Sequence, residues 1–405
     1  MLGLLSSRRN GADEPPRLRV AESTRRVFNL ELSSERDVEC VHSSGVNVLD
    51  IDQAENKYML SGGADGVIAI YNLENVSQKP QYTCKAICTV GRSHAHVHQY
   101  SVETVQWYTH DTGMFLSSSF DKTLKAWDTN ALEPAEIYTF SEKVYCHHMS
   151  PIATQHSLIA VGTSGSKVQL CDLRTGSSTH ILNGHRNAVL AARWSTRHEF
   201  VLATGSRDNS AKLWDVRKAT GCLLTLDQHK GEAWGGSKSS SSRDRSGTQT
   251  SHGGHVNGLC FTKDGLHLLT LGTDDRLKLW RTDTGTNLLV NYGRVSNGSR
   301  KGVKFAVSAD CSPDLVFIPM GSHVTAFEIY SGRAHTQLSG HYNKVNCCEY
   351  YSDFQELYSG GNDSNILVWV PNMGRTQPEE EETDKKSGSK QRSGFQDSWS
   401  NSDED

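Results

Sequence analysis

The sequence has no long apolar run and no strong excess of charge of one sign. No stretch approaches the roughly 20 apolar residues that a membrane-spanning helix needs, and Arg8–Arg9 interrupts the N-terminus too early for a secretory signal. The 42 Lys and Arg residues nearly balance 46 Asp and Glu, which gives a net charge of −4. Nothing therefore draws the whole chain to nucleic acid or to an anionic membrane. We expect a soluble intracellular protein with no membrane partner and no direct sequence-specific nucleic-acid binding.

The sequence also lacks the short motifs of common catalytic and metal sites. It has no phosphate-binding glycine loop, no H-E-x-x-H and no paired C-x-x-C. His94, His96 and His98 cluster in one predicted loop, but no cysteine or carboxylate lies at ligand spacing from them. We expect no metal, no cofactor and no catalytic residue.

Proline is scarce, with 9 residues against 35 Gly, which is typical of a turn-rich globular chain. Five segments repeat one pattern: a Ser or Thr, an Asp four residues later, and a closing Trp or Tyr six residues after the Asp. The aspartates are Asp65, Asp121, Asp208, Asp274 and Asp363, and the closing residues include Trp127, Trp214, Trp280 and Trp369. Such fixed spacing at a period of about 40–45 residues indicates a WD-repeat propeller.

In three repeats a Gly-His pair precedes the Asp, and the histidines are His185, His255 and His341. We expect each His to join the Ser or Thr, the Asp and the Trp in one buried hydrogen-bonded chain, because buried polar groups must be paired. This recurrence favours a structural origin for the Ser–His–Asp sets over a catalytic triad.

Two degenerate repeats at 159–173 and 316–329 keep the strand–turn–strand pattern but carry Gly165 and Gly321 where the Asp would stand. Counting them, the sequence predicts an all-β, seven-bladed WD40 β-propeller over 37–370. The last repeat stops at Pro371 without an outermost strand. We expect a β-like run at 37–41 to supply this strand and close the ring.

Three further segments flank or interrupt the propeller. Residues 18–32 read as an amphipathic helix within a segment 1–36, and this helix either packs on its own propeller or is presented to another protein. The stretch 229–252 is predicted to be a flexible insert. The tail 371–405 is acidic, polar and predicted to be disordered, and Ser400 and Ser402 in it suit an acid-directed kinase.

Beyond the repeat, longer segments carry a family resemblance. AESTRRV (21–27), SVETVQWY (101–108), SSSFDKTLK (117–125) and FQELYSG (354–360) together resemble the Cockayne syndrome group A family of WD-repeat proteins. The resemblance implies the substrate receptor of a cullin-4 RING ubiquitin ligase that acts in transcription-coupled nucleotide excision repair at stalled RNA polymerase II. It also implies a nuclear location, in nucleoplasm, chromatin and nuclear matrix.

The resemblance further implies the partners. The N-terminal helix would dock on the ligase adaptor, the large subunit of the damaged-DNA-binding protein, through Arg25, Val27, Phe28 and Leu30. Cullin-4 and the RING subunit would follow through that adaptor. The propeller faces would engage the Cockayne syndrome group B ATPase and the UV-stimulated scaffold protein.

Receptors of this class often carry W-D-x-R boxes at the ends of blades. Trp214 opens a complete box with Asp215 and Arg217, whereas the preceding blade keeps Asp172 and Arg174 behind a Cys. We expect these residues to contact the adaptor, although they can equally tie a blade edge to the neighbouring loop.

Other functions remain open at this stage. A WD-repeat scaffold or histone-tail reader outside the ubiquitin system would share the fold. A direct binder of DNA lesions would show strongly salt-dependent duplex binding, and a propeller enzyme would show activity on its own.

Overall fold

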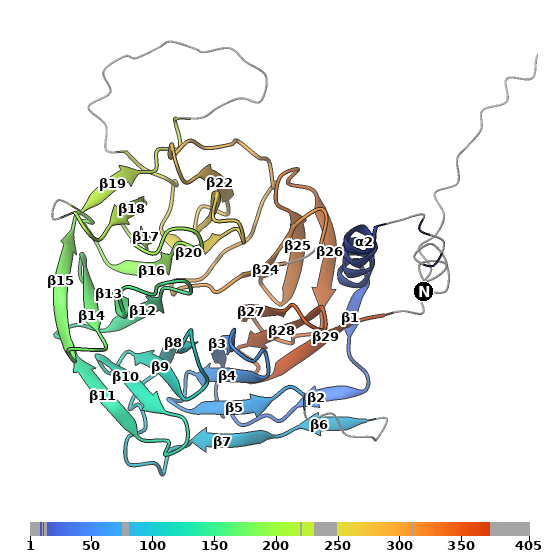
Figure 1. The fold of residues 1–405 in the computed structure, drawn as a ribbon, viewed down its shortest axis with the longest axis horizontal. Helices are drawn as coiled ribbons and strands as arrows, with labels where there is room; N and C mark the ends of the chain where they lie inside the picture. Colours follow the sequence, from blue (N-terminus) through green and yellow to red (C-terminus); the bar gives the residue numbers. More distant parts are fainter. Residues whose placement is uncertain are drawn as a thin grey trace, which may run out of the picture. The chain divides into compact units, whose positions relative to one another are not determined.

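The computed structural model contains seven radial β-sheets arranged in a ring, seen face-on in Figure 1. This confirms the predicted seven-bladed propeller, including the two degenerate blades. The structure describes residues 9, 11, 14–74, 81–218, 221–230, 249–308 and 311–372. Most of the predicted insert and tail, with Ser400 and Ser402, therefore lies outside the described residues.

The first four blades follow one another along the chain, each with four antiparallel strands. Their strands are β3 (Val46–Ile51), β4 (Tyr58–Gly63), β5 (Ile68–Asn72) and β7 (Ala86–Val90); β8 (Val102–Trp107), β9 (Met114–Ser119), β10 (Thr123–Asp128) and β11 (Pro134–Thr139); β12 (Val144–Met149), β13 (Leu158–Thr163), β14 (Lys167–Asp172) and β15 (Ser177–Asn183); β16 (Val189–Trp194), β17 (Val201–Ser206), β18 (Ala211–Asp215) and β19 (Cys222–Thr225).

The fifth blade has three strands among the described residues, and the last two blades have four. Their strands are β20 (Val256–Phe261), β21 (His267–Gly272) and β22 (Leu277–Arg281); β23 (Ala306–Val307), β24 (Leu315–Met320), β25 (His323–Glu328) and β26 (Ala334–Ser339); β27 (Val345–Tyr351), β28 (Glu356–Gly361), β29 (Ile366–Pro371) and, from the N-terminus, β1 (Leu30–Leu32).

Each repeat Asp holds the tight turn between the second and third strands of its blade. In the second blade, the Asp121 carboxylate accepts a hydrogen bond from the Thr123 backbone N–H at 3.0 Å. The residue after each Asp has a positive φ, and these residues are Gly66, Lys122, Asn209, Asp275 and Ser364. A side-chain acceptor and one left-handed residue let the strand reverse within a few positions, which explains why the repeat places Asp there.

The hydrophobic core lies between blades rather than within one. Val48 and Leu60 of the first blade, for example, pack in one cluster with Val105 and Trp107 of the second. The closing tryptophans are almost fully buried in these clusters, and they are Trp127, Trp214, Trp280 and Trp369. Each blade thus needs its neighbours to bury its faces, so the ring folds as one unit.

The predicted hydrogen-bonded chain is present in full in four blades. In the second blade, His98 lies 2.7 Å from Asp121 through Nδ1 and 2.7 Å from Ser117 through Nε2, and the Trp127 indole N–H donates to Ser117 at 2.7 Å. His185 and His341 occupy the same position in the fourth and seventh blades. The fifth blade has the fourth full chain, in which the Trp280 indole N–H donates to Thr270 at 2.9 Å. In the first blade, His42 contacts Asp65 and Ser61 at this position, but Tyr71 replaces the Trp and its hydroxyl donates to the Glu39 carbonyl.

The prediction of His255 as the blade histidine is wrong. His252 takes that place instead, at 2.9 Å from Asp274 and 2.7 Å from Thr270, and it is fully buried. His255 is half-buried and contacts Asn209 of the neighbouring blade at 3.2 Å. The number of residues between the His and the Asp explains the difference. His252 lies 22 residues before Asp274, close to the 23 that separate His98 from Asp121, whereas His255 lies only 19 residues before Asp274.

The ring is closed by β1, not by the predicted run at 37–41. Leu30 pairs with Pro371 and Leu32 with Trp369, antiparallel to β29. The expected segment instead gives β2 (Arg36–Val38), which pairs in parallel with β6 (Tyr82–Cys84) beside the first blade. The segment 1–36 is therefore more than an appendage, since it completes the seventh blade and removes its open edge.

The N-terminal helix begins three residues and ends four residues earlier than predicted. Helix α2 runs over Pro15–Phe28, begins with prolines in its first turn and ends before Asn29. Leu30, which the sequence placed in the helix, lies in strand β1.

Candidate docking surfaces

The ring has two faces that differ in the loops they carry. The upper face is formed by the turns that hold the repeat aspartates, together with the connections between blades. The lower face is formed by the loops that join the first strand to the second and the third strand to the fourth. Because every blade has the same strand order, each loop can be assigned to a face from its place in the repeat.

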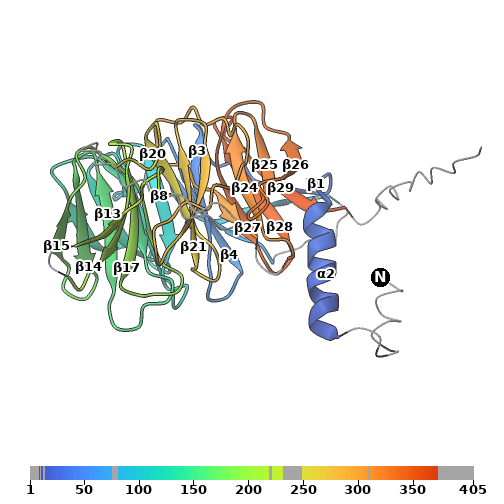
Figure 2. The same cartoon turned by 90° about the horizontal axis from the view of Figure 1, so that it is seen from above.

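Helix α2 packs against loops of the lower face. The Ser312 backbone N–H donates to the Thr24 hydroxyl at 2.9 Å, and the Arg26 guanidinium donates to the Phe354 carbonyl at 3.1 Å. Both partners lie in loops between first and second strands, in the sixth and seventh blades. Figure 2 shows α2 beside β1 and β29 at the rim, with its N-terminal end reaching past the strands.

The four helix-region residues predicted to bind the adaptor have different surroundings. Val27 and Leu30 are buried in the core of the last blades, where 3% and 4% of their surface is exposed. Phe28 is half-buried, with its ring centroid 3.9 Å from that of His335. Arg25 is more accessible and pairs with Glu22 at 3.0 Å. Val27 and Leu30 thus fix the helix on the propeller, and the exposed surface belongs to Arg25 and the first turns of α2.

The complete W-D-x-R box forms a rigid lower-face corner. Both the Nε and the Nη2 of Arg217 donate to the Asp215 carboxylate, at 2.9 and 2.8 Å, and the guanidinium lies 4.7 Å from the Phe200 ring centroid. The hydrogen bonds from Arg217 lower the pKa of Asp215. Most of the Arg217 side chain stays exposed, so its position is fixed while one side remains open to a partner.

The incomplete box of the third blade is built differently. The Asp172 carboxylate accepts hydrogen bonds from the Ser157 hydroxyl and the Arg174 backbone N–H, both at 3.0 Å. Arg174 is exposed and lies in the loop after β14, also on the lower face. Asp172 therefore holds the blade edge together. The Arg174 side chain forms no ion pair with an acid among the described residues.

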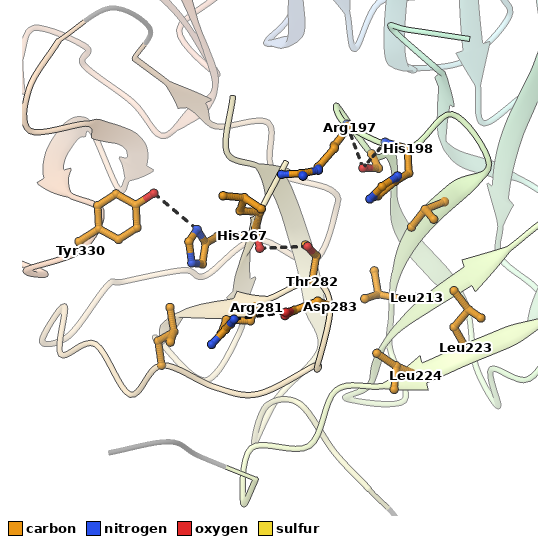
Figure 3. Close-up of a pocket in the computed structure, with 14 residues that line it drawn as sticks. Arg197, His198, Leu213, Leu223, Leu224, His267, Arg281, Thr282, Asp283 and Tyr330 are labelled. Carbon is orange, nitrogen blue, oxygen red and sulfur yellow. Dashed lines mark hydrogen bonds and ion pairs between the residues drawn. The ribbon is translucent and has the colours of Figure 1, made fainter. Parts of the chain in front are cut away.

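A groove of about 1060 Å³ lies on the lower face across the fourth, fifth and sixth blades. Figure 3 shows Leu213, Leu223 and Leu224 on one side of it, across from His267 and Tyr330. Sequence reasoning missed this groove, because its apolar residues come from three blades and share no local pattern. A second hollow of about 640 Å³, lined by Arg197, His198 and Arg217 among others, adjoins it and connects it to the complete box.

Comparison with known proteins places this geometry in a family. The family model described as "WD domain, G-beta repeat" matches residues 89–128, 176–215, 243–281 and 332–370. The chain is 36% identical over 410 residues to WD repeat-containing protein ATCSA-1 of Arabidopsis thaliana, an alignment that covers 86% of this chain and 90% of that protein. The chain belongs to the WD-repeat family of ATCSA-1.

More distant relatives share only part of the chain. Radiation-sensitive protein 28 of Saccharomyces cerevisiae is 27% identical over 202 residues, covering 46% of this chain and 39% of that protein. A ribosome biogenesis protein WDR12 homolog of Drosophila persimilis is 30% identical over 206 residues, covering 47% of each. The WD-repeat propeller is typically a scaffold for protein–protein contacts, and the resemblance to the ATCSA-1 family is consistent with a receptor role.

In this chain, the histidines that were considered as metal ligands, His94, His96 and His98, take part in hydrogen bonds within the propeller. His98 belongs to the hydrogen-bonded chain of the second blade, and in the loop before it the His96 backbone N–H donates to Nδ1 of His94 at 3.2 Å. No group of three or more metal-ligating side chains occurs among the described residues. No helix in the same residues has the length and apolar character that crossing a membrane requires.

Proposed function

We propose that this chain is the substrate-recognition subunit of a cullin-4 RING ubiquitin ligase that acts in transcription-coupled nucleotide excision repair in the nucleus. Its adaptor would be the large subunit of the damaged-DNA-binding protein. Its targets would lie at stalled RNA polymerase II, together with the Cockayne syndrome group B ATPase and the UV-stimulated scaffold protein. The proposal rests on the family resemblance and on one structural observation.

That observation is the shared position of the two elements the sequence singled out. The accessible part of α2 precedes the first blade and the Arg217 corner follows the third strand of the fourth blade, yet both lie on the lower face. The apolar groove lies between them and reaches Tyr330 in the sixth blade, which also carries the Ser312 contact to α2. A helix, an apolar groove and a fixed arginine on one face give the combination of apolar anchors and an orienting charge that a stable protein interface needs.

The mechanism of such a receptor is proximity. The lower face holds the chain on the adaptor, and the upper face remains free to bind a target protein. The target is then held near a ubiquitin-conjugating enzyme carried elsewhere in the complex, which raises the effective concentration of its lysines. The propeller contributes binding and orientation, and the bond-forming steps take place on other subunits.

The proposal is tested by binding of the full chain to the purified adaptor subunit. A variant with Arg25→Glu and Arg217→Glu changes one partly exposed and one exposed lower-face charge, and Lys122→Glu with Arg186→Glu makes the same charge change on the upper face. We expect the dissociation constant of the lower-face variant to rise by about tenfold or more, since reversed charges at an interface oppose binding. The upper-face control should bind with the wild-type affinity. Equal affinity of all three proteins, with unchanged thermal unfolding, would show that the lower face is not the adaptor site.

A further inference from the structure

Five side chains form a connected group at the upper mouth of the central channel, which we name the cation–aromatic cluster: Phe120, Lys143, Tyr145, Arg207 and Lys301. Phe120 and Tyr145 meet edge to face, with ring centroids 5.2 Å apart. They come from the second and third blades, Arg207 from the fourth, and Lys301 from the loop that precedes the sixth. The cluster therefore joins four parts of the ring around one opening.

Each cation of the cluster is held over a ring face. The Lys143 and Lys301 ammonium groups lie 5.7 and 4.9 Å from the centroid of Phe120, and the Arg207 guanidinium lies 5.7 Å from that of Tyr145. Contacts of this kind restrict long side chains that would otherwise sample many rotamers. The positive charges are thus ordered before any ligand binds, which reduces the entropy cost of binding.

Two of the three cations have no acidic partner among the described residues. Lys301 pairs with the buried Glu103 at 2.7 Å, whereas Lys143 and Arg207 contact only aromatic rings through their side chains. Neither Lys143 nor Arg207 forms an ion pair with another described residue of the propeller. Their charges are available to a ligand.

The surrounding turns and loops of the upper face carry both cations and acids. Four exposed cations there are Lys122, Arg186, Arg276 and Arg300. The described acids of these turns and loops are the five turn aspartates, Glu142, Asp227, Asp275, and Glu35, Asp37 and Glu39 of the connection before the first blade, and Asp275 is paired with Arg294 at 3.0 Å. Acids therefore offset the cations over the face as a whole, and the positive charge open to a ligand is local to Lys143 and Arg207.

We propose that the cation–aromatic cluster binds an acidic peptide segment of a target protein. Arg207 and Lys143 would receive Asp or Glu carboxylates, and Arg207 can do so through two parallel hydrogen bonds because its plane is fixed on Tyr145. An apolar side chain of the same peptide would rest on the partly exposed rings of Phe120 and Tyr145. The cluster is on the face opposite the proposed adaptor contacts, so this inference stands apart from them and assigns target recognition to the upper face.

The geometry favours a peptide over a single-stranded nucleic acid. Proteins bind unpaired bases by stacking them on open aromatic faces. Here the Phe120 face and the Tyr145 face are already covered by cations, so a base would have to displace them. Below the cluster the channel narrows to a space of about 40 Å³ lined by Tyr145 and Glu103, among others. A ligand therefore lies across the upper face and does not thread into the channel.

The test is the binding of labelled synthetic peptides to the full chain, measured by fluorescence anisotropy. One peptide of about twelve residues carries several Asp and Glu around a Leu, a second replaces the acids with Asn and Gln, and an oligo-dT strand of similar length is the third probe. We expect the acidic peptide alone to bind, and its dissociation constant to rise several-fold between about 50 mM and about 300 mM salt, because exposed charge pairs are screened.

Variants separate the cluster from other parts of the surface. Lys143→Gln with Arg207→Gln should weaken binding of the acidic peptide by about tenfold, since two exposed charge pairs are lost together. Arg174→Glu, on the lower face, is the matched control and should leave peptide binding unchanged. Adaptor binding should show the reverse pattern, so a failure of one proposal does not mimic a failure of the other.

Two results would overturn this inference. One is equal binding of the acidic peptide to the wild-type chain and to the Lys143 and Arg207 double variant, when both unfold at the same temperature. The other is tighter binding of oligo-dT than of the acidic peptide, which would show that the cluster serves nucleic acid.

Discussion

At the scale of single residues, the repeat is explained by the direction of its hydrogen bonds. The Trp127 indole can only donate, so the Ser117 oxygen accepts its N–H. The Ser117 hydroxyl can then donate to Nε2 of His98, which leaves Nδ1–H to donate to Asp121. We assign this tautomer from the chain of donors. Burial alone would raise the pKa of Asp121, but the hydrogen bonds from His98 and Thr123 outweigh burial and lower that pKa to about 2.

These proton positions predict how the free energy of unfolding depends on pH. Burial lowers the pKa values of His98 and His252 below the usual 6.5, so the folded state keeps both neutral where the unfolded chain becomes protonated. Their contribution is complete above about pH 6.5 and declines as the pH falls through that value. Denaturant titrations from about pH 7.5 to about pH 5 should show a falling free energy of unfolding. A flat profile over that window would contradict the assignment.

The correction at the fifth blade predicts a contrast between two neighbouring histidines. His252→Ala removes a partner from the buried Thr270 and Asp274, and we expect it to cost about 2–4 kcal/mol of unfolding free energy. His255→Ala should cost about 1 kcal/mol or less, because its one contact is partly exposed. Chemical denaturation of the two variants measures both. A larger loss for His255→Ala would reverse the correction.

The same positions show what local pattern can and cannot supply. The spacing of Asp, Ser or Thr and Trp was read correctly in all five repeats, since tight turns and strand pairing fix those intervals. The Gly-His pair misled at His255 and missed His42 and His98, whose preceding residue is Val. The separation from the Asp, at 22 or 23 residues, is the better signal because the connecting loop must return to the same turn.

At the scale of elements, the N-terminal segment closes the ring. The helix prediction ran past Phe28 because Leu30 follows Val27 by three residues and Leu32 follows Phe28 by four, which continues a helical stripe. The chain becomes extended at Leu30 since the edge of β29 offers backbone hydrogen bonds there. Long-range pairing of this kind cannot be read from a local pattern. The run at 37–41 was an equally reasonable strand, but it pairs with β6.

Closure by β1 predicts unequal effects of two nearby leucines. Leu30→Ala empties a site in the core of the last blades, where 4% of the side chain is exposed, and should lower the free energy of unfolding by about 2–4 kcal/mol. Leu32→Ala changes a side chain that is 45% exposed and should cost less than about 1 kcal/mol. Thermal and denaturant unfolding check both. Similar, small losses would mean that β1 does not seal the ring.

At the scale of the whole molecule, the two faces differ in chemistry. The lower face carries the exposed turns of α2, the Arg217 corner and the apolar groove. The upper face carries Lys143 and Arg207 on aromatic rings, and neither has an acidic partner in the part of the chain that the structure describes. The sequence indicated the box and the helix because each is local. It could not indicate the groove or the cation–aromatic cluster, since their residues meet only when distant blades come together.

The account's central claim is that the lower face is the adaptor surface and the upper face stays free. Hydrogen–deuterium exchange of the full chain, with and without the large subunit of the damaged-DNA-binding protein, tests it most directly. The account predicts slower exchange in α2 and in the loops at 197–200 and 281–283, with no change in the turns at 120–122 and 207–209. Protection of the upper-face turns, with none on the lower face, would contradict it.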